Sequence, residues 1–171
     1  AKFLSAIGDF ERLSDHAMNI AEVETEIHEK KIVFSQQATE ELSILTSCIE
    51  EIVSKSVEAF CNDDANLALT IQPLEEVVDL LCDELKLRHV NRLQNGQCTI
   101  NLGFVFNDLL TNYERISDHC NNLANYIVRL SSHIAGMHEY WSGSAQTEIF
   151  RVKFDEYKEK YYGQLKDSFA K

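Results

Sequence analysis

A twelve-residue segment occurs twice in this chain, and this repeat constrains the fold more than any other feature of the sequence. Residues 10–21 read FERLSDHAMNIA, and residues 113–124 read YERISDHCNNLA. The charged residues of the two copies are in register, about one hundred residues apart. A repeat of this kind predicts duplicated three-helix units rather than one irregular domain.

Apolar residues around each copy follow the periodicity of an amphipathic helix. Around the second copy they recur at alternating steps of four and three residues and form one seam: Leu102, Phe106, Leu109, Tyr113, Ile116, Cys120, Leu123, Ile127 and Leu130. The matching seam of the first copy comprises Phe3, Ala6, Phe10, Leu13, Ala17, Ile20 and Ile27. Both segments are therefore predicted to be helices that pack in the same way.

Capping and turn residues divide the chain into five expected helices. They cover approximately residues 1–30, 35–61, 65–93 and 99–131, with a last helix from residue 144 onward. Pro73 is expected to kink the third helix, because it lacks an N–H and its ring clashes with the preceding turn. One Pro and six Gly leave few breaks in the chain, so strands are not expected.

Pairs of carboxylates occupy equivalent positions on three of these helices. The members of each pair lie four residues apart, at heptad positions b and f, on the face turned away from the seam. The pairs are Glu11 with Asp15, Asp79 with Asp83, and Glu114 with Asp118. Like charges at this spacing repel by about 0.2–0.5 kcal/mol, so a positive counterpart is expected. Carboxylate oxygens suit hard cations, and a metal site is the sharper of two hypotheses.

The simpler hypothesis is that these acids are ordinary surface residues. Arg12 lies three residues before Asp15, and Arg115 lies three before Asp118, which is the spacing of surface ion pairs worth a few tenths of a kcal/mol. Copying of the whole block favours a specific role, because solubility does not require identical residues. For the pair on the third helix, which other acids surround, both hypotheses stay open. His16 and His119 follow the second acid of each copy and are candidate ligands beside the acidic patch.

The repeated block resembles the signature helix of the PhoU family of phosphate-transport regulators, in which an E/DxxxD motif recurs on paired helices. The segment from about Phe34 to Leu130 resembles one complete PhoU repeat, and Ala1 to Lys30 resembles the last helix of a preceding one. The resemblance implies an all-α fold of antiparallel three-helix-bundle repeats, with the first repeat truncated, plus a C-terminal helix. The corresponding division is 1–33, 34–132 and 133–171.

The resemblance also implies metal ions as cofactors, namely iron or zinc clusters, with Mg²⁺ or Mn²⁺ as further candidates. The implied ligands fall into two sites: Glu114, Asp118, Asp79 and Asp83 in one, and Glu11 and Asp15 in the other. The second of these lacks its partner pair, because the first two helices of the first repeat are missing.

Residues 133–171 resemble the extension that follows PhoU-like domains fused to sodium-dependent phosphate cotransporters. We therefore expect a regulatory domain that controls phosphate transport, in the cytoplasm at the inner face of the membrane. Its expected partners are a phosphate transporter, either the membrane portion of the same protein or a separate complex, and the phosphate ion. The alternative is a metal-free helical interaction module of a transporter or signalling system.

The chain opens inside a helical seam, so we expect it to be a piece of a larger protein with an apolar stripe to cover. That stripe comprises Phe3, Phe10, Leu13 and Ile20. We expect either a homodimer or coverage by aromatic residues of the last helix: Phe150, Phe154, Tyr157 and Tyr161.

Charge and composition exclude several classes of function. A formal net charge of −12 disfavours nucleic acids and anionic lipid surfaces as partners. No apolar run approaches the roughly 18–20 residues that span a bilayer. Five cysteines without a CxxC spacing predict free thiols in a reducing compartment. The sequence shows no Glu-x-x-His pair, nucleophile elbow or phosphate-binding glycine loop, so we expect no enzyme activity.

Overall fold

The computed structural model describes residues 2–135 and 143–167, and all regular structure within these ranges is helical. The elements in chain order are α1 (Lys2–Glu29), α2 (Gln36–Asn62), α3 (Ala65–Ala68), α4 (Ile71–Gln94), α5 (Ile100–Ala135), α6 (Gly143–Tyr157), the π-helical turn η1 (Lys158–Tyr162) and α7 (Gly163–Asp167). The expectation of an all-α fold is confirmed. None of the helices in the described ranges combines the length and the apolar run needed to cross a bilayer.

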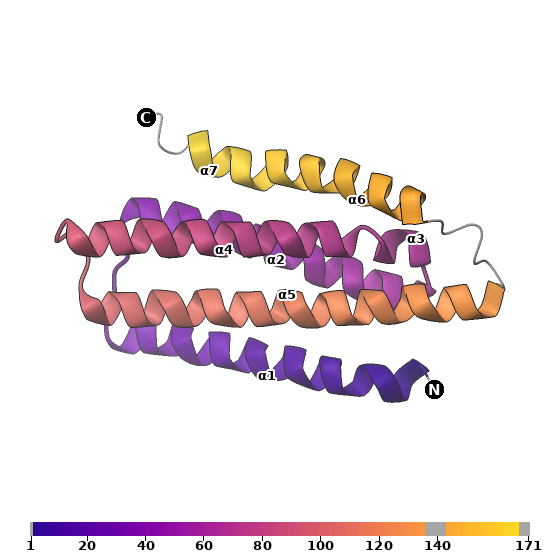
Figure 1. Ribbon diagram of the computed structural model, residues 1–171. Helices are drawn as coiled ribbons and strands as arrows, with labels where there is room; N and C mark the ends of the chain where they lie inside the picture. The colour runs from indigo at the N-terminus through magenta and orange to yellow at the C-terminus, as the bar shows by residue number, and fades with distance from the viewer. Residues whose placement is uncertain (1, 136–142, 168–171) are drawn as a thin grey trace.

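Helix α5 lies at the centre of the bundle, with α1 on one side and α2 and α4 on the other (Figure 1). Helices α1 and α5 run in opposite directions, and α4 and α5 also run antiparallel (Figure 1). The C-terminal elements α6, η1 and α7 pack along α4 and α2, away from α1. The repeat therefore brings its two copies together in space, as neighbouring antiparallel helices.

Local capping residues explain where the helices begin and end. Ser35 caps α2, and its side chain accepts a hydrogen bond from the backbone N–H of Ala38 at 3.2 Å. Asp64 caps α3 through the N–H of Leu67 at 3.0 Å. The expected kink at Pro73 is wrong, because the chain breaks earlier, between Ala68 and Ile71. Pro73 thus falls in the first turn of α4, where a backbone N–H would have no partner within the helix, so its missing N–H costs no hydrogen bond.

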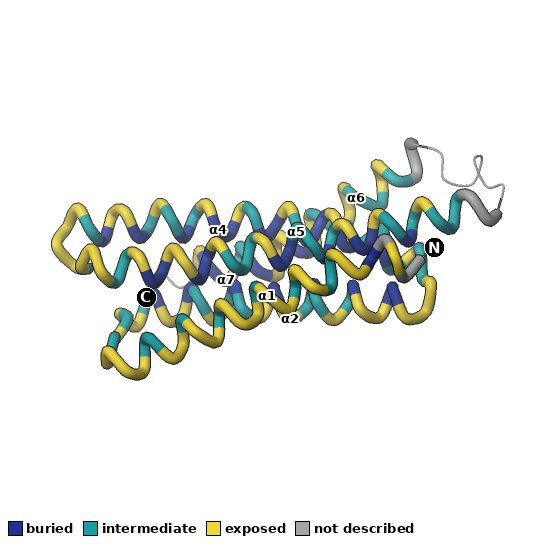
Figure 2. Tube along the Cα trace, turned by 90° about the horizontal axis from the view of Figure 1, so that it is seen from below, coloured by how far each residue is buried: buried dark blue, intermediate teal, exposed yellow. Residues whose placement is uncertain are grey.

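The core lies between α2, α4 and α5, and the predicted seam of α5 lines it (Figure 2). Most seam residues are buried, among them Phe106, Ile116, Cys120, Leu123 and Ile127. The heptad interpretation of this helix is therefore confirmed, since apolar residues recurring at steps of four and three form one buried face.

The apolar stripe of α1 is covered by the bundle itself, and not by the C-terminal helix. Phe10, Leu13 and Ile20 pack against the core, and the Phe10 ring meets the ring of Phe60 on α2 edge-on at 5.0 Å between centroids. The expectation that the tail covers this stripe is wrong, because α5 already provides the apolar partner. The side chain of Phe3 lies outside the described residues.

The tail belongs to the same core as the bundle. Tyr157, Tyr161 and Leu165 are 5%, 3% and 0% exposed, so the tail is anchored in the core from Tyr157 to Leu165. Lys160 Nζ also donates to Glu51 at 2.7 Å, and the Tyr161 hydroxyl donates to the same carboxylate. Burial alone would raise the pKa of Glu51, but its hydrogen bonds outweigh that effect and lower the pKa to about 2. The Glu51 carboxylate that binds the tail is therefore ionised at any ordinary pH.

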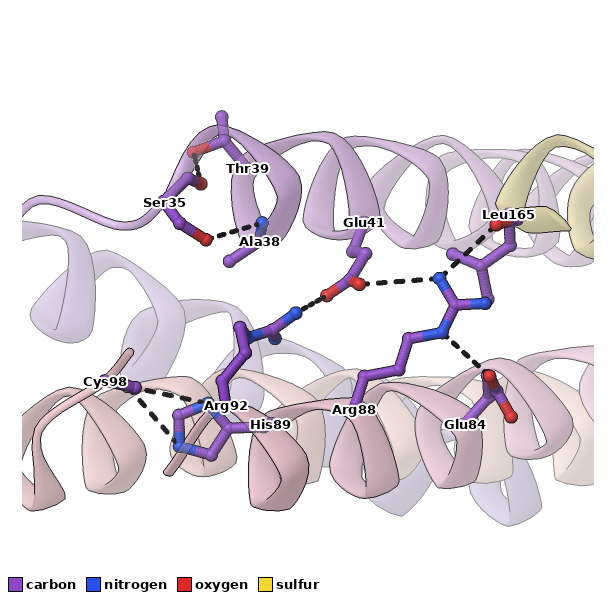
Figure 3. A network of polar contacts seen from close by, with 10 residues as sticks. All are labelled: Ser35, Ala38, Thr39, Glu41, Glu84, Arg88, His89, Arg92, Cys98 and Leu165. Atoms are coloured by element: carbon purple, nitrogen blue, oxygen red, sulfur yellow. Dashed lines mark hydrogen bonds and ion pairs between the residues drawn. The ribbon is translucent and has the colours of Figure 1, made fainter. Parts of the chain in front are cut away.

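A buried ionic network joins α2 to α4 and to α7 (Figure 3). The carboxylate of Glu41 is fully buried and accepts from Arg92 Nη1 at 2.8 Å, with Arg88 Nη1 at 3.5 Å. Arg88 also donates to Glu84 at 2.7 Å and to the backbone carbonyl of Leu165 at 3.3 Å. These contacts hold two core guanidinium groups against one carboxylate and tie the end of the tail to them.

Candidate metal-binding surface

Three of the predicted metal ligands lie close enough across the α4–α5 pair for their charges to interact. Asp79 lies on α4, while Glu114 and Asp118 lie on α5. The pKa of Asp79 is raised to about 6, first by burial and then by the negative charges of Asp118 and Glu114. Asp79 on α4 therefore faces the pair Glu114 and Asp118, which lie four residues apart on α5.

Sequence reasoning missed a fourth member of this set, Glu75, one helical turn before Asp79. Its pKa is raised to about 7, mainly by burial and then by the charges of Asp79, Glu76 and Asp118, against a hydrogen bond from Asn121. The signal was present in the sequence, because Glu75, Asp79 and Asp83 form a row of acids four residues apart on α4. We call Glu75, Asp79, Asp83, Glu114 and Asp118 the acidic surface.

Asp83 lies at the edge of the acidic surface. Its side chain is 78% exposed, and its nearest basic group is Lys86 Nζ at 4.0 Å. Among the causes of the raised pKa of Asp79, Asp83 contributes less than Asp118 and Glu114. We therefore place Asp83 outside the centre of the candidate site.

Two basic side chains already neutralise part of the acidic surface. Lys86 Nζ donates to Glu114 at 2.6 Å, and Arg115 Nη1 donates to Asp118 at 3.1 Å. The second contact is the surface ion pair that the simpler sequence hypothesis predicts. Five carboxylates still face two cations, and the neighbouring negative charges add to burial in raising the pKa values of Glu75 and Asp79.

The chemistry of these donors fits a metal ion better than their arrangement does. A set of carboxylate oxygens with excess negative charge is what hard cations bind, and a cation nearby would lower the raised pKa values. Among the described residues, no group of three His, Cys, Asp or Glu side chains is arranged to hold a metal ion. Side-chain rotation would therefore have to accompany binding.

The second predicted acid pair lies on α1 and is separate from the acidic surface. Glu11 and Asp15 are both exposed. Neither of them contributes to the raised pKa values of Glu75 and Asp79. They therefore do not belong to the acidic surface.

The two candidate histidine ligands lie between α1 and α5. The Nδ1 atom of His119 is 2.9 Å from Oδ1 of Asp9, and Nδ1 of His16 is 2.9 Å from Oδ1 of Asn112. Each imidazole thus bonds across the interface to a residue of the other helix. The repeated block therefore divides into acids that lie away from the α1–α5 interface and a histidine that faces the other copy.

The raised pKa of Asp79 predicts how stability depends on pH in the absence of metal. Because its folded pKa exceeds its unfolded value, Asp79 contributes stability at low pH that is lost as the pH rises through about 6. We expect Asp79→Asn in chelator to raise the free energy of unfolding at pH 7.5 by roughly 1 kcal/mol after discounting for solvent screening. Urea unfolding should show this gain shrinking at pH 5.

Asp83→Asn is the matched control for this prediction. It removes the same charge one helical turn after Asp79, and the Asp83 side chain is 78% exposed. It should change stability less than Asp79→Asn does at both pH values. An Asp79→Asn variant that is less stable than the parent at pH 7.5 would contradict the excess of negative charge.

Comparison with known proteins adds the family. A PhoU domain model matches residues 42–127, just over half of the chain. The phosphate-specific transport system accessory protein PhoU homolog 1 of Thermotoga maritima is 27% identical over 124 residues, which is 72% of this chain and 53% of that relative. The chain thus spans about half the length of the curated relative, and no solved structure matches it. From the matched bundle helices and the copied acidic block, we conclude that this chain belongs to the PhoU family.

Proposed function

We propose that this chain is a regulatory domain of phosphate transport that binds metal ions on the acidic surface. Membership of the PhoU family supports the regulatory role, and the Thermotoga maritima relative is named as an accessory protein of a phosphate-specific transport system. The observation that carries metal binding is a group of partly buried carboxylates across α4 and α5. Their pKa values are raised to about 7 for Glu75 and about 6 for Asp79, first by burial and then by the negative charges of their neighbours.

Three carboxylates would hold the ion, namely Asp79, Glu114 and Asp118, with Glu75 and Asp83 at the edges. A bound iron or zinc ion, or Mg²⁺ or Mn²⁺, would neutralise these groups and offer positive charge to phosphate oxygens. Glu114 has to give up its 2.6 Å contact with Lys86 to become a ligand. Lys86 therefore competes with the metal for Glu114. Metal binding would displace the Lys86 side chain, and a partner could recognise that local change in the surface.

The remaining proposals concern the setting of the domain. We propose a phosphate transporter as the partner, with the membrane portion of a sodium-dependent cotransporter as the favoured parent, and a location at the cytoplasmic face of the membrane. We also propose homodimerisation, because α1 leaves Leu4, Ile7 and Met18 at 78%, 47% and 60% exposed. Glu11 and Asp15 would form a second site only with acids from a helix outside the described residues.

Metal content tests the main proposal directly. Protein purified without chelator should carry tightly bound metal by elemental analysis, and the double variant Glu114→Ala with Asp118→Ala should lose it. Chelator should also lower the melting temperature of the parent, because a ligand at about 100 times its Kd adds about 2.7 kcal/mol to the folded state. The double variant should show no such shift.

The matched control is Asp155→Ala with Glu159→Ala, an exposed acidic pair at the same spacing on the tail. This variant loses the same charge and should keep the metal of the parent. Metal content that is unchanged in the Glu114 and Asp118 variant would reject the site.

The ion pairs of Lys86 with Glu114 and of Arg115 with Asp118 favour a second candidate, a metal-free helical interaction module. In that case the acidic surface contacts a basic surface of a partner, and nearby lysine and arginine side chains are its counter-ions. Chelator would then leave the melting temperature of the parent unchanged, and elemental analysis would find no bound metal.

A further inference from the structure

The hydrogen bonds between α1 and α5 form two equivalent sets. In one set, Oδ1 of Asp9 accepts from Nδ1 of His119 at 2.9 Å and from Nδ2 of Asn122 at 3.1 Å. In the other, Oδ1 of Asn112 is 2.9 Å from Nδ1 of His16 and accepts from Nδ2 of Asn19 at 3.2 Å. Each set pairs a histidine and an asparagine of one helix with a single oxygen of the other.

The two sets are related by the internal repeat. His16 corresponds to His119, and Asn19 corresponds to Asn122, since both pairs occupy the same places in the copied block. Asp9 and Asn112 each stand directly before that block. The contacts therefore follow a local two-fold axis between antiparallel helices. The imidazole rings of the two histidines lie next to each other near this axis, with centroids 5.8 Å apart and planes at 25°.

The tautomer and the amide orientation are consistent with this arrangement. The carboxylate of Asp9 can only accept, so Nδ1 of His119 is the donor. Nδ2 of Asn112 donates to the backbone carbonyl of Asp108 at 2.8 Å, which turns Oδ1 of Asn112 toward α1. The side chains of His119 and Asp9 are only 20% and 22% exposed, so little water competes for their contact.

We propose that these six residues are a positioning clamp that fixes the axial register of α1 against α5. The α1–α5 clamp comprises Asp9, His16, Asn19, Asn112, His119 and Asn122. All four of its interhelical bonds break together if one helix slides along the other by a turn, about 5.4 Å. The copied block then carries two separate tasks: its acids form the carboxylate pairs away from the α1–α5 interface, and its histidine and asparagine hold the two copies together.

The clamp also connects the two acid pairs mechanically. Asp15 directly precedes His16, and Asp118 directly precedes His119. Any change in register would move the acids of α1 relative to those of α5 by the same distance. The inference itself does not depend on metal binding, because all clamp contacts are between side chains of this chain.

Spin-label distances between α1 and α5 test the clamp. Labels at Glu24→Cys and Asn107→Cys, both exposed positions, are used with the exposed or half-buried Cys61 and Cys98 replaced by Ser. In chelator, the parent should give one narrow distance distribution. His16→Ala with His119→Ala should broaden or shift it, whereas His16→Asn with His119→Asn should restore it, because an Asn amide can donate from near the place of Nδ1.

A double-mutant cycle provides a second readout on each side of the axis. The effects of His119→Ala and Asp9→Ala on the urea midpoint should be smaller together than their sum, and the same should hold for His16→Ala with Asn112→Ala. A distance distribution that stays narrow in the double Ala variant would overturn the clamp. So would additive effects in both cycles, or Asn variants as broad as the Ala variants. Since metal is removed throughout, these outcomes do not depend on the metal site.

Discussion

Replacing Glu41 by Ala is expected to lower the free energy of unfolding by about 3–5 kcal/mol, because it breaks a buried ion pair. The Glu41 carboxylate is fully buried between Arg92 and Arg88, whose side chains are 7% and 12% exposed. Removing it takes the carboxylate partner from Arg92 and leaves Arg88 paired with Glu84. Arg92 already has a buried Nη2 atom without a hydrogen-bond partner. Uncompensated buried charge is among the costliest defects in a protein core.

Urea-induced unfolding measures this effect, and the neighbouring residue supplies the control. Glu40 is exposed on the same helix, and Glu40→Ala should change stability by no more than about 0.5 kcal/mol. A Glu41→Ala variant as stable as Glu40→Ala would mean that water or another anion reaches the two arginines. The network would then not be the closed one drawn in Figure 3.

The second large effect is expected at Leu165, near the end of the tail. Its side chain is 0% exposed, although α7 is only five residues long. Leu165→Ala should cost about 2–5 kcal/mol, because it removes buried methyl groups and leaves a cavity between the tail, α2 and α4. A single cooperative transition with a lower midpoint is expected, since the tail shares the core of the bundle.

Gln164→Ala is the control for the tail, because Gln164 is exposed and its side chain bonds to the carbonyl of Lys160, in its own helical turn, at 2.6 Å. It should leave the midpoint almost unchanged. If Leu165→Ala behaves like Gln164→Ala, the tail unfolds separately before the bundle does, and its anchoring in the core is wrong.

Features that depend on helical periodicity could be predicted from the sequence. The seam of α5 follows from positions along a single helix. So does the four-residue spacing within each acid pair, Asp79 with Asp83 and Glu114 with Asp118. Periodicity also placed the two copies on helices, and the structure shows that these two helices pack against each other. Which way each helix faces is therefore largely a local property of this chain.

Features that depend on which helices meet could not be predicted. Nothing near Glu41 in the sequence indicates that Arg88 and Arg92 lie opposite it, because those contacts cross from α2 to α4. The histidines of the block looked like neighbours of the acids along the chain, whereas their partners Asp9 and Asn112 come from the other copy. The apolar stripe of α1 predicts either a dimer or coverage by the tail, whereas in the structure α5 packs against that stripe.

The π-helical turn η1 has a geometric consequence for the tail. Residues four apart drift round an α-helix by about 40° per step, since 3.6 residues make one turn. Over the two steps from Tyr157 to Leu165, this drift would turn the side chain of Leu165 away from the face that Tyr157 occupies. The wider turn between Lys158 and Tyr162 absorbs that rotation, and Tyr157, Tyr161 and Leu165 all stay buried. One local widening of the backbone thus lets a short, charged segment present a straight apolar edge to the rest of the molecule.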